Sequence, residues 1–224
     1  MSAGIPPQTL TIDIISDVVC PWCYVGKRKL EAALALKADV PVQLRWHPYQ
    51  LDPTIPQGGL PRRDYMEKKF GSTGRLAEIH ERLETVGRES HIPFAFGKIE
   101  HSPNTLDAHR LIRWAESAGV QDAVVERLFR AYFEEGADIG DHAVLLRVAG
   151  ERGMDAGIVQ NLLAGDSDAD AVRADIAQAQ RLGVNGVPFF IIGGRFAVSG
   201  AQSTQVLVKA IERALVPDGE SAVG

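Results

Sequence analysis

The chain has 224 residues, of which 45% are hydrophobic and 24% charged, and its formal net charge is −5 at pH 7. This length suffices for a sizeable core, and the composition is that of a globular domain rather than a disordered chain. The acidic balance argues against a nucleic-acid partner, because nucleic-acid-binding domains carry a basic surplus or a clustered basic stripe.

No apolar stretch of the sequence is long enough to span a bilayer, so we predict no membrane partner. Residues 1–15 lack the basic start, apolar run and cleavage site of a secretory signal. We therefore expect a cytoplasmic location, where structural disulfides rarely persist. A close cysteine pair in that compartment points to redox chemistry or metal binding rather than to a structural staple.

The first part of the chain has the pattern of a strand, a helix and a second strand. Residues 9–19 are rich in Ile and Val, and residues 40–49 alternate apolar with polar side chains, so both predict strands. Between them, residues 22–37 carry apolar side chains at helical spacing, and Pro21 suits the first turn of that helix. A helical crossover makes the two strands parallel.

The middle of the chain is predicted to be helical. Residues 50–61 have the Pro- and Gly-rich composition of a linker. The helices expected after it cover residues 62–70, 73–89, 105–118, 121–135, 141–151, 155–164 and 168–182. The basic residues of the first of these helices are interleaved with acidic ones, which indicates a solvated helix face. These basic residues are Arg62, Arg63, Lys68 and Lys69.

Strand signals return near the C-terminus, in residues 187–192 and 195–199 around a Gly-Gly turn, and a helix is expected over residues 203–215. The element order predicts an α/β protein with the thioredoxin fold, a mixed four-stranded sheet interrupted by a large all-helical insertion. The predicted domains are a discontinuous thioredoxin-like domain, residues 9–60 and 184–216, and a helical insert domain, residues 61–183.

The two cysteines of the chain lie two residues apart, in the sequence Cys20-Pro21-Trp22-Cys23 at the predicted junction of strand and helix. A helix N-terminus presents free N–H groups and the positive end of a dipole, which stabilise a thiolate. We therefore expect Cys20 to be the attacking nucleophile. Cys23, one turn further and more buried, is then the resolving thiol that clears the mixed disulfide.

A metal site or a pair of ordinary small buried residues would also account for the two cysteines. A zinc site needs four ligands, but there is no third cysteine and the six histidines are scattered, so we predict no metal. The proline between the cysteines, at a helix start within a β–α–β unit, argues against two residues that merely fill the core. The spacing of Cys20 and Cys23 alone leaves both alternatives open.

The segment Gly-Val-Pro-Phe-Phe is the second candidate element. In the predicted fold, the loop before Val187 returns beside the first helix. A cis bond at Pro188 would leave the Val187 backbone open to an extended substrate segment, whereas the start of an edge strand accounts for this proline equally well.

Three segments together resemble the DsbA-like thioredoxin superfamily, in particular its FrnE-like dithiol–disulfide oxidoreductases. They are "SDVVCPWCYVGKRKLEAAL", "SPNTLDAHRLIRWA" and "GVNGVPFFIIGGRFAVSGAQ". The resemblance implies a redox-active disulfide Cys20–Cys23, a cis-proline at Pro188, and thiols or disulfides of proteins or small molecules as partners. It implies no tightly bound cofactor, with glutathione as a co-substrate.

The same resemblance extends to 2-hydroxychromene-2-carboxylate isomerases and kappa-class glutathione transferases, which typically carry serine where this chain has Cys20. A glutathione-dependent isomerase or transferase is therefore the alternative function, and a non-redox partner-binding module is the third. The second cysteine favours thiol–disulfide exchange as an oxidoreductase or disulfide isomerase.

Three further residues are weaker candidates. Asp17 is either a proton acceptor for Cys23 or a strand-end cap, and Asn104 is either part of the substrate cleft or a helix N-cap. Trp22 is expected at the surface, where it would contact substrate together with Pro21, Val187 and Pro188.

Overall fold

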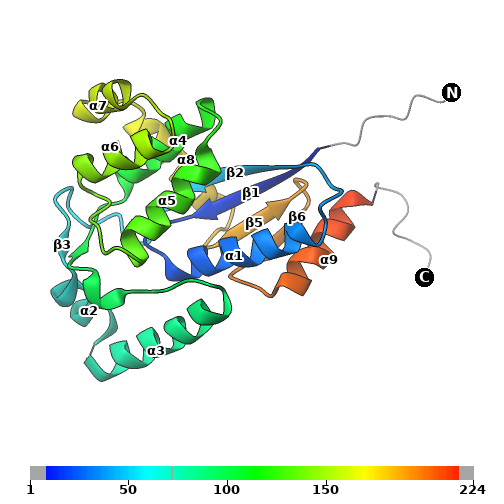
Figure 1. Ribbon diagram of the computed structural model, residues 1–224, viewed down its shortest axis with the longest axis horizontal. Coiled ribbons are helices and arrows are strands. Elements are labelled where there is room, and N and C mark those ends of the chain that lie inside the picture. Colours follow the sequence, from blue (N-terminus) through cyan, green and yellow to red (C-terminus); the bar gives the residue numbers. More distant parts are fainter. Residues whose placement is uncertain (1–8, 72, 217–224) are drawn as a thin grey trace.

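The computed structural model describes residues 9–71 and 73–216, and its centre is a mixed four-stranded sheet in the order β2-β1-β5-β6 (Figure 1). Its strands are β1 (Leu10–Ser16), β2 (Val42–Pro48), β5 (Phe189–Ile192) and β6 (Phe196–Ser199). β1 pairs in parallel with β2 and antiparallel with β5, and β5 pairs antiparallel with β6. This topology confirms the predicted α/β thioredoxin fold.

Two helices from opposite ends of the chain pack together along one face of this sheet, α1 (Pro21–Ala35) and α9 (Thr204–Leu215) (Figure 1). The strands meet them with alternate side chains, because successive residues of a strand point to opposite faces. Ile12 and Ile14 are fully buried in the main core with Leu30 of α1 and Ile211 of α9. One face of β1 is therefore packed on both α1 and α9.

The segment between β2 and β5 is mostly helical. Its elements are α2 (Arg62–Phe70), α3 (Thr73–Glu89), the 3₁₀ turn η1 (Phe96–Lys98), α4 (Leu106–Ser117), α5 (Gln121–Phe133), α6 (His142–Glu151), α7 (Ala156–Ala164) and α8 (Ala169–Arg181). None of the helices described is both long and apolar enough to cross a membrane. The boundaries of the two domains stay a prediction.

The insert also contains a short ladder that was not predicted. β3 (Leu60–Pro61) pairs antiparallel with β4 (His101–Ser102), so the insert is not helical throughout. Two-residue strands carry no periodic pattern, which is why no sequence signal marks them. The ladder joins the end of the predicted linker to the segment that leads into α4.

The first strand is shorter than predicted, because residues 17–19 form a turn rather than its last part. The N–H of Cys20 donates to the carbonyl of Asp17 at 2.9 Å. Val18 is buried in the core and is apolar for that reason, not because it belongs to a strand. This turn brings Cys20 to the N-cap of α1.

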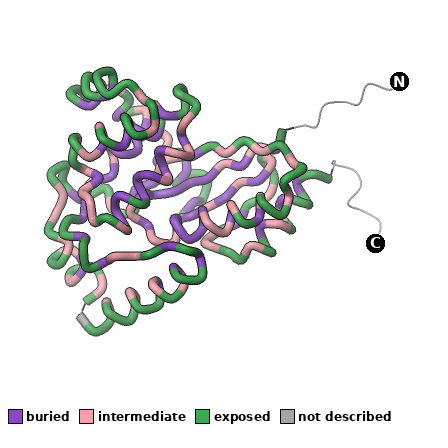
Figure 2. Tube along the Cα trace, viewed as in Figure 1, coloured by how far each residue is buried: buried purple, intermediate pink, exposed green. Residues whose placement is uncertain are grey.

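The main core runs without a break from the sheet into the insert, as the buried positions of Figure 2 show. Aromatic side chains make the junction between α1 and α5. Tyr24, next to Cys23, stacks on Phe129 with ring centroids 4.9 Å apart and lies 6.2 Å from Phe133. The helix that carries the cysteines is therefore fixed to the insert by its own first turn.

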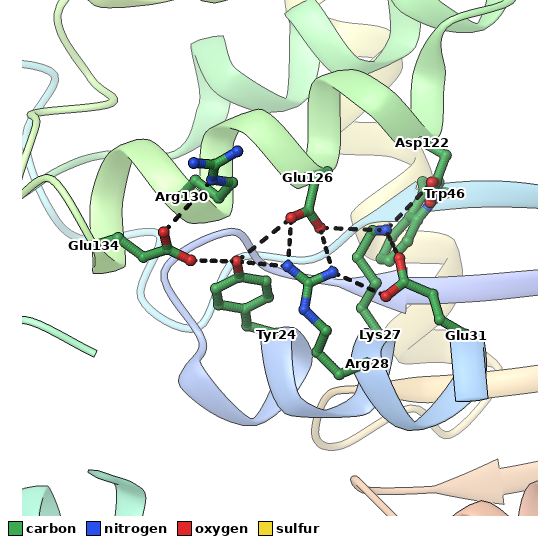
Figure 3. Close-up of polar contacts among 9 residues, drawn as sticks. All are labelled: Tyr24, Lys27, Arg28, Glu31, Trp46, Asp122, Glu126, Arg130 and Glu134. Carbon is green, nitrogen blue, oxygen red and sulfur yellow. Dashed lines mark hydrogen bonds and ion pairs between the residues drawn. The ribbon is translucent and has the colours of Figure 1, made fainter. Parts of the chain in front are cut away.

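An ionic cluster extends this junction along α1 and α5 (Figure 3). Lys27 forms ion pairs with Glu31, with Asp122 at 3.2 Å and with Glu126 at 3.3 Å. Burial alone would lower the pKa of Lys27, but Asp122, Glu31 and Glu126 outweigh it and hold the pKa above its ordinary value. Lys27 is therefore charged at neutral pH although its side chain is only 2% exposed.

The phenol of Tyr24 belongs to the same cluster (Figure 3). It donates to Glu134 at 2.7 Å and accepts from Arg28 at 2.9 Å, and Arg28 also pairs with Glu126. Burial, followed by the hydrogen bond to Glu134, raises the pKa of Tyr24, so the phenol stays protonated. We call these residues, Tyr24, Lys27, Arg28, Glu31, Asp122, Glu126 and Glu134, the α1–α5 clamp.

Replacing Lys27 by methionine is expected to lower the free energy of unfolding by about 2 kcal/mol. Removal of one partner of a buried pair costs about 3–5 kcal/mol, but here the remaining carboxylates are 23–45% exposed and can regain water. Lys37→Met, which breaks a surface pair with Glu212, is the matched control, with an effect within about 0.5 kcal/mol. Urea unfolding of both variants measures the difference, and equal effects would contradict a stabilising role of the clamp.

Candidate active site

The two cysteines occupy the N-terminus of α1. Cys20 is the N-cap residue with extended backbone angles, Pro21 takes the first helical position, and the N–H of Cys23 donates to the carbonyl of Cys20 at 3.0 Å. Both are free thiols, 4% and 1% exposed respectively. The residue expected to be more buried, Cys23, is the more buried one.

The loop before β5 returns to this helix end, 167 residues further along the chain. The Val187–Pro188 bond is cis, which confirms the predicted cis-proline. The thiol of Cys20 donates to the carbonyl oxygen of Val187 at 3.7 Å. A substrate sulfur bonded to Sγ of Cys20 would therefore lie next to the backbone carbonyl of Val187.

Gly26 allows this approach of helix and loop. A Cβ atom on Gly26 would lie 2.8 Å from Cγ of Pro188, closer than real Cβ contacts occur, and 3.2 Å from Cζ of Phe190, which is also tight. The absence of a side chain at Gly26 therefore lets the cis-proline loop pack directly on the first turns of α1.

The environment of Cys23 keeps its thiol protonated. Burial raises the pKa of the Cys23 thiol well above its ordinary value, and the neighbouring Cys20 raises it further. The side chain of Ser16 and the main chain of Asp17 act in the opposite direction. The hydroxyl of Ser16 is buried without a hydrogen bond while Cys23 is a thiol, so it is available to a thiolate at Cys23.

The carboxylate of Asp17 points elsewhere. It accepts the N–H of Leu51 at 2.8 Å, and its second oxygen lies 3.4 Å from Nε2 of His109. That nitrogen also lies 2.9 Å from the carbonyl of Tyr49, so it carries a proton, because a carbonyl only accepts. The structure thus brings the main chain of Asp17 to Cys23, whereas its side chain fixes the loop after β2.

Asn104 has the same kind of role. Its side chain accepts from Gln50 at 3.0 Å and from the N–H of Leu106 at 2.9 Å, and donates to the carbonyl of Ile55 at 2.6 Å. It therefore supports the first turn of α4 and holds the loop after β2, but it is not the N-cap residue that the structural alternative predicted. The N-cap position itself is Thr105. Asn104 is not among the residues that line the cavity described next, so its predicted place in a substrate cleft gains no support.

A cavity of about 520 Å³ opens beside Cys20, between the turn before α1, the loop after β2 and the helices α2 and α3 of the insert. Pro21, Trp22 and Val187, which were predicted to contact substrate, line it together with Gly186, whereas Pro188 does not. The ring of Trp22 is partly buried against the core and has the guanidinium of Arg82 5.9 Å from its centre. Trp22 is therefore a wall of the cavity rather than a freely exposed side chain.

Most cavity residues from the insert were not predicted, among them Arg62 and His80. Arg62 was expected on a solvated helix face, but it lines the cavity and its Nη1 donates to the hydroxyl of Tyr132 at 2.9 Å. His80 of α3 also lines it and stacks on Phe96, with ring centroids 4.4 Å apart. Burial, with the nearby charge of Arg62, lowers the pKa of His80, so the imidazole is neutral at pH 7. Only the packing of the insert reveals these positions.

Among the residues described, no three His, Cys, Asp or Glu side chains come together as metal ligands would.

The sequence of residues 11–212 matches the model of the DSBA-like thioredoxin domain. The chain belongs to this family. The match covers both cysteines, the insert and the cis-proline, so the DsbA-like thioredoxin domain comprises both the sheet and the helical segment between its halves.

Individual relatives agree with this assignment. The chain is 29% identical to the uncharacterised protein YwbO of Bacillus subtilis over 205 residues, which are 91% of this chain and 96% of that protein. A solved probable DsbA oxidoreductase, SCO1869 of Streptomyces coelicolor, is 32% identical with a TM-score of 0.83, over 92% of this chain and 89% of the other. A solved 2-hydroxychromene-2-carboxylate isomerase, 17% identical with a TM-score of 0.65 over 91% and 95%, shares the fold.

Proposed function

We propose that this DsbA-like protein is a thiol–disulfide oxidoreductase that exchanges disulfides through Cys20 and Cys23. One observation carries the proposal: the Cys20 thiol lies at a helix N-terminus, faces the carbonyl of Val187 before the cis-proline, and lines the cavity. The helix dipole places its positive end at this position, which favours an anionic sulfur. A substrate disulfide in the cavity would lie within its reach.

The exchange proceeds in two displacements. The Cys20 thiolate attacks one sulfur of the substrate disulfide, the substrate S–S bond breaks, and one half leaves as a thiolate that takes up a proton. Cys23 then loses its proton and attacks Sγ of Cys20, which releases the second half. The substrate is reduced to two thiols and Cys20–Cys23 is oxidised. The same steps run in reverse when dithiol substrates are oxidised by the Cys20–Cys23 disulfide.

The other site residues have supporting roles in this proposal. Pro21 starts the helix, Trp22 forms a wall of the cavity, and Val187 with Pro188 presents a backbone carbonyl to the substrate. Asp17 and Asn104 hold the loop after β2, which forms the cavity edge, and Ser16 stabilises the Cys23 thiolate. The partners are thiols and disulfides in the cytoplasm, and no tightly bound cofactor is required.

Replacing Cys23 by serine is expected to trap the mixed disulfide between Cys20 and the substrate. Without the resolving thiol the first displacement has no successor, so the adduct accumulates in a one-to-one ratio. Mass spectrometry of the intact protein after incubation with a disulfide, with and without dithiothreitol, measures the adduct. A Cys20→Ser/Cys23→Ser protein is the control. An adduct on that control, or none on Cys23→Ser, would contradict the assignment.

The second displacement is expected to speed up about tenfold per pH unit between pH 6 and pH 9. Burial raises the pKa of Cys23 above its ordinary value of 9.0, so over this range the thiolate fraction grows in proportion to hydroxide. At each pH, samples of the reacting wild-type protein are quenched with acid over time, and the decay of the mixed disulfide on Cys20 gives the rate of the second displacement. A rate that levels off before pH 9 would show that the pKa of Cys23 is not raised above its ordinary value. Ser16→Ala is expected to lower the rate throughout.

The alternative is a glutathione-dependent isomerase or transferase, and the cavity of small-molecule size beside residue 20 favours it as the second candidate. That function predicts tight glutathione binding and turnover that survives loss of Cys23. A non-redox binding module predicts instead that Trp22 fluorescence does not change with the redox state of Cys20 and Cys23. Glutathione titration and fluorescence of the oxidised and reduced protein test both.

A further inference from the structure

The approach to Cys20 limits the size of its substrate. Cys20 is only 4% exposed, and the space beside it is the cavity of about 520 Å³. That volume lies in the range of small-molecule sites, about 300–1,000 Å³. A low-molecular-weight disulfide fits a space of this size, and with Cys20 only 4% exposed a bulky disulfide reaches its sulfur less easily.

The lining of the cavity limits the polarity of the substrate. Most of its side chains are aliphatic or aromatic, among them Leu51, Ile55, Met66, Phe70, Leu83 and Phe96. Such a lining favours an apolar body. Polar side chains are the minority of this lining, so a peptide-like thiol with several amide groups would bury some of them without partners, which is costly.

Arg62 is the exception in this lining. Its one side-chain hydrogen bond goes to the neutral hydroxyl of Tyr132, and in the described part of the chain no Asp or Glu oxygen lies within 4.0 Å of its guanidinium. Its neighbour Arg63, outside the cavity, pairs with Glu67 at 3.2 Å. Arg62 therefore has free donors and an uncompensated charge beside an apolar space, which suits a carboxylate.

The acidic side chains of the cavity do not supply this partner. Asp17 accepts from the N–H of Leu51, and Asp52 accepts from the N–H and the hydroxyl of Thr54. Both carboxylates are engaged by the loop after β2. The cations Lys69 and Arg82 lie over aromatic rings at the cavity, Lys69 5.1 Å from the ring centre of Tyr65, and add positive charge around it.

We infer that the substrate of Cys20 is a low-molecular-weight disulfide with an apolar, ring-sized body and a carboxylate that binds Arg62. This inference rests on the proposed function and names the substrate class of the same site. The exchange keeps the balance given above: one substrate disulfide yields two thiols, and a dithiol such as dithiothreitol reduces Cys20–Cys23 for the next turnover. Arg62 is then a specificity-determining residue.

The wild-type protein tests the substrate class. The probes are 4,4′-dithiodibenzoate, its bis-amide, oxidised glutathione and, as a small reference, bis(2-hydroxyethyl) disulfide. Each kcat/KM, with dithiothreitol as reductant, is divided by the rate constant of dithiothreitol alone with the same disulfide, which removes intrinsic reactivity. We expect the normalised value for the dithiodibenzoate to exceed that for oxidised glutathione at least about tenfold. Equal values would overturn the inference.

Arg62→Gln tests the carboxylate partner. The ratio of the dithiodibenzoate to its bis-amide is expected to fall about tenfold, because one charge-assisted contact is lost. Arg62→Lys is expected to recover part of the ratio, and Arg63→Gln is the matched control with the wild-type ratio. An unchanged ratio in Arg62→Gln would overturn the role of Arg62. If bis(2-hydroxyethyl) disulfide reacted no faster with the wild type than with Cys20→Ser, the proposed function itself would fail.

Discussion

Cys20→Ser is expected to abolish disulfide exchange, with a fall in kcat/KM of at least about 10³-fold. A serine hydroxyl does not ionise near neutral pH, so the attacking anion is lost. Cys23 cannot replace it, because it is 1% exposed and burial holds its pKa well above the ordinary value. Turnover of a small disulfide such as bis(2-hydroxyethyl) disulfide, with dithiothreitol as the reductant, measures the loss.

The same variant separates the two enzymatic functions. Cys20→Ser creates the serine that is typical of the glutathione-dependent relatives at this position, so such an isomerase or transferase would keep its turnover. The unfolding midpoint is the control, because serine is close to cysteine in size and the hydrogen bond of the Cys20 thiol to Val187, at 3.7 Å, is weak. A stable Cys20→Ser protein with wild-type exchange would refute the oxidoreductase.

The parts of the fold that could be predicted are those with a local signal. The strands and helices of the sheet have periodic apolar positions, and Cys20-Pro21-Trp22-Cys23 combines a helix start with two thiols. The family resemblance implies the cis-proline at Pro188, which placement alone left open, and the structure confirms it. The helices α6 and α7 begin at Asp141 and Asp155, whose side chains accept N–H groups of the first turn, as N-caps do.

The parts that could not be predicted depend on packing between distant segments. Arg62 looks like any exposed helical arginine until the position of Tyr132, 70 residues away, is known. The side chain of Asp17 turns to His109 and the loop after β2, and alternation along a strand does not describe a turn residue. Ser16 could not be predicted either, because its unbonded hydroxyl matters only next to the buried thiol of Cys23.

Helix α1 connects the α1–α5 clamp with the cavity. α1 carries Cys20 at its first turn, Tyr24 at the junction with α5, and Lys27 one turn later. Because the same helix is held by the insert on one side and meets the cis-proline loop on another, the distance between Cys20 and the cavity walls is fixed before substrate binds. Preorganisation of this kind lowers the entropy that binding would otherwise cost.

Gly26→Ala is expected to lower kcat/KM about 10²-fold and to reduce the free energy of unfolding by about 1–2 kcal/mol. Alanine favours a helix over glycine by about 1 kcal/mol, but overpacking a core costs about 1–3 kcal/mol. The new Cβ would meet the ring of Pro188 at 2.8 Å, and that ring cannot rotate away as a flexible side chain does. The loop must therefore shift, and Val187 shifts with it relative to Cys20. A displacement of about 1 Å is enough for a 10²-fold loss.

Gly150→Ala in α6 is the matched control for this variant. A Cβ at Gly150 has no atom within 4 Å, so only the helix propensity changes and the protein is expected to gain up to about 1 kcal/mol with wild-type kcat/KM. Urea unfolding and disulfide turnover of both variants give the comparison. If Gly26→Ala behaved like Gly150→Ala in both measurements, close contact between α1 and the cis-proline loop would not be what positions Val187 at Cys20. A loss confined to Gly26→Ala, and larger in turnover than in stability, would establish that it is.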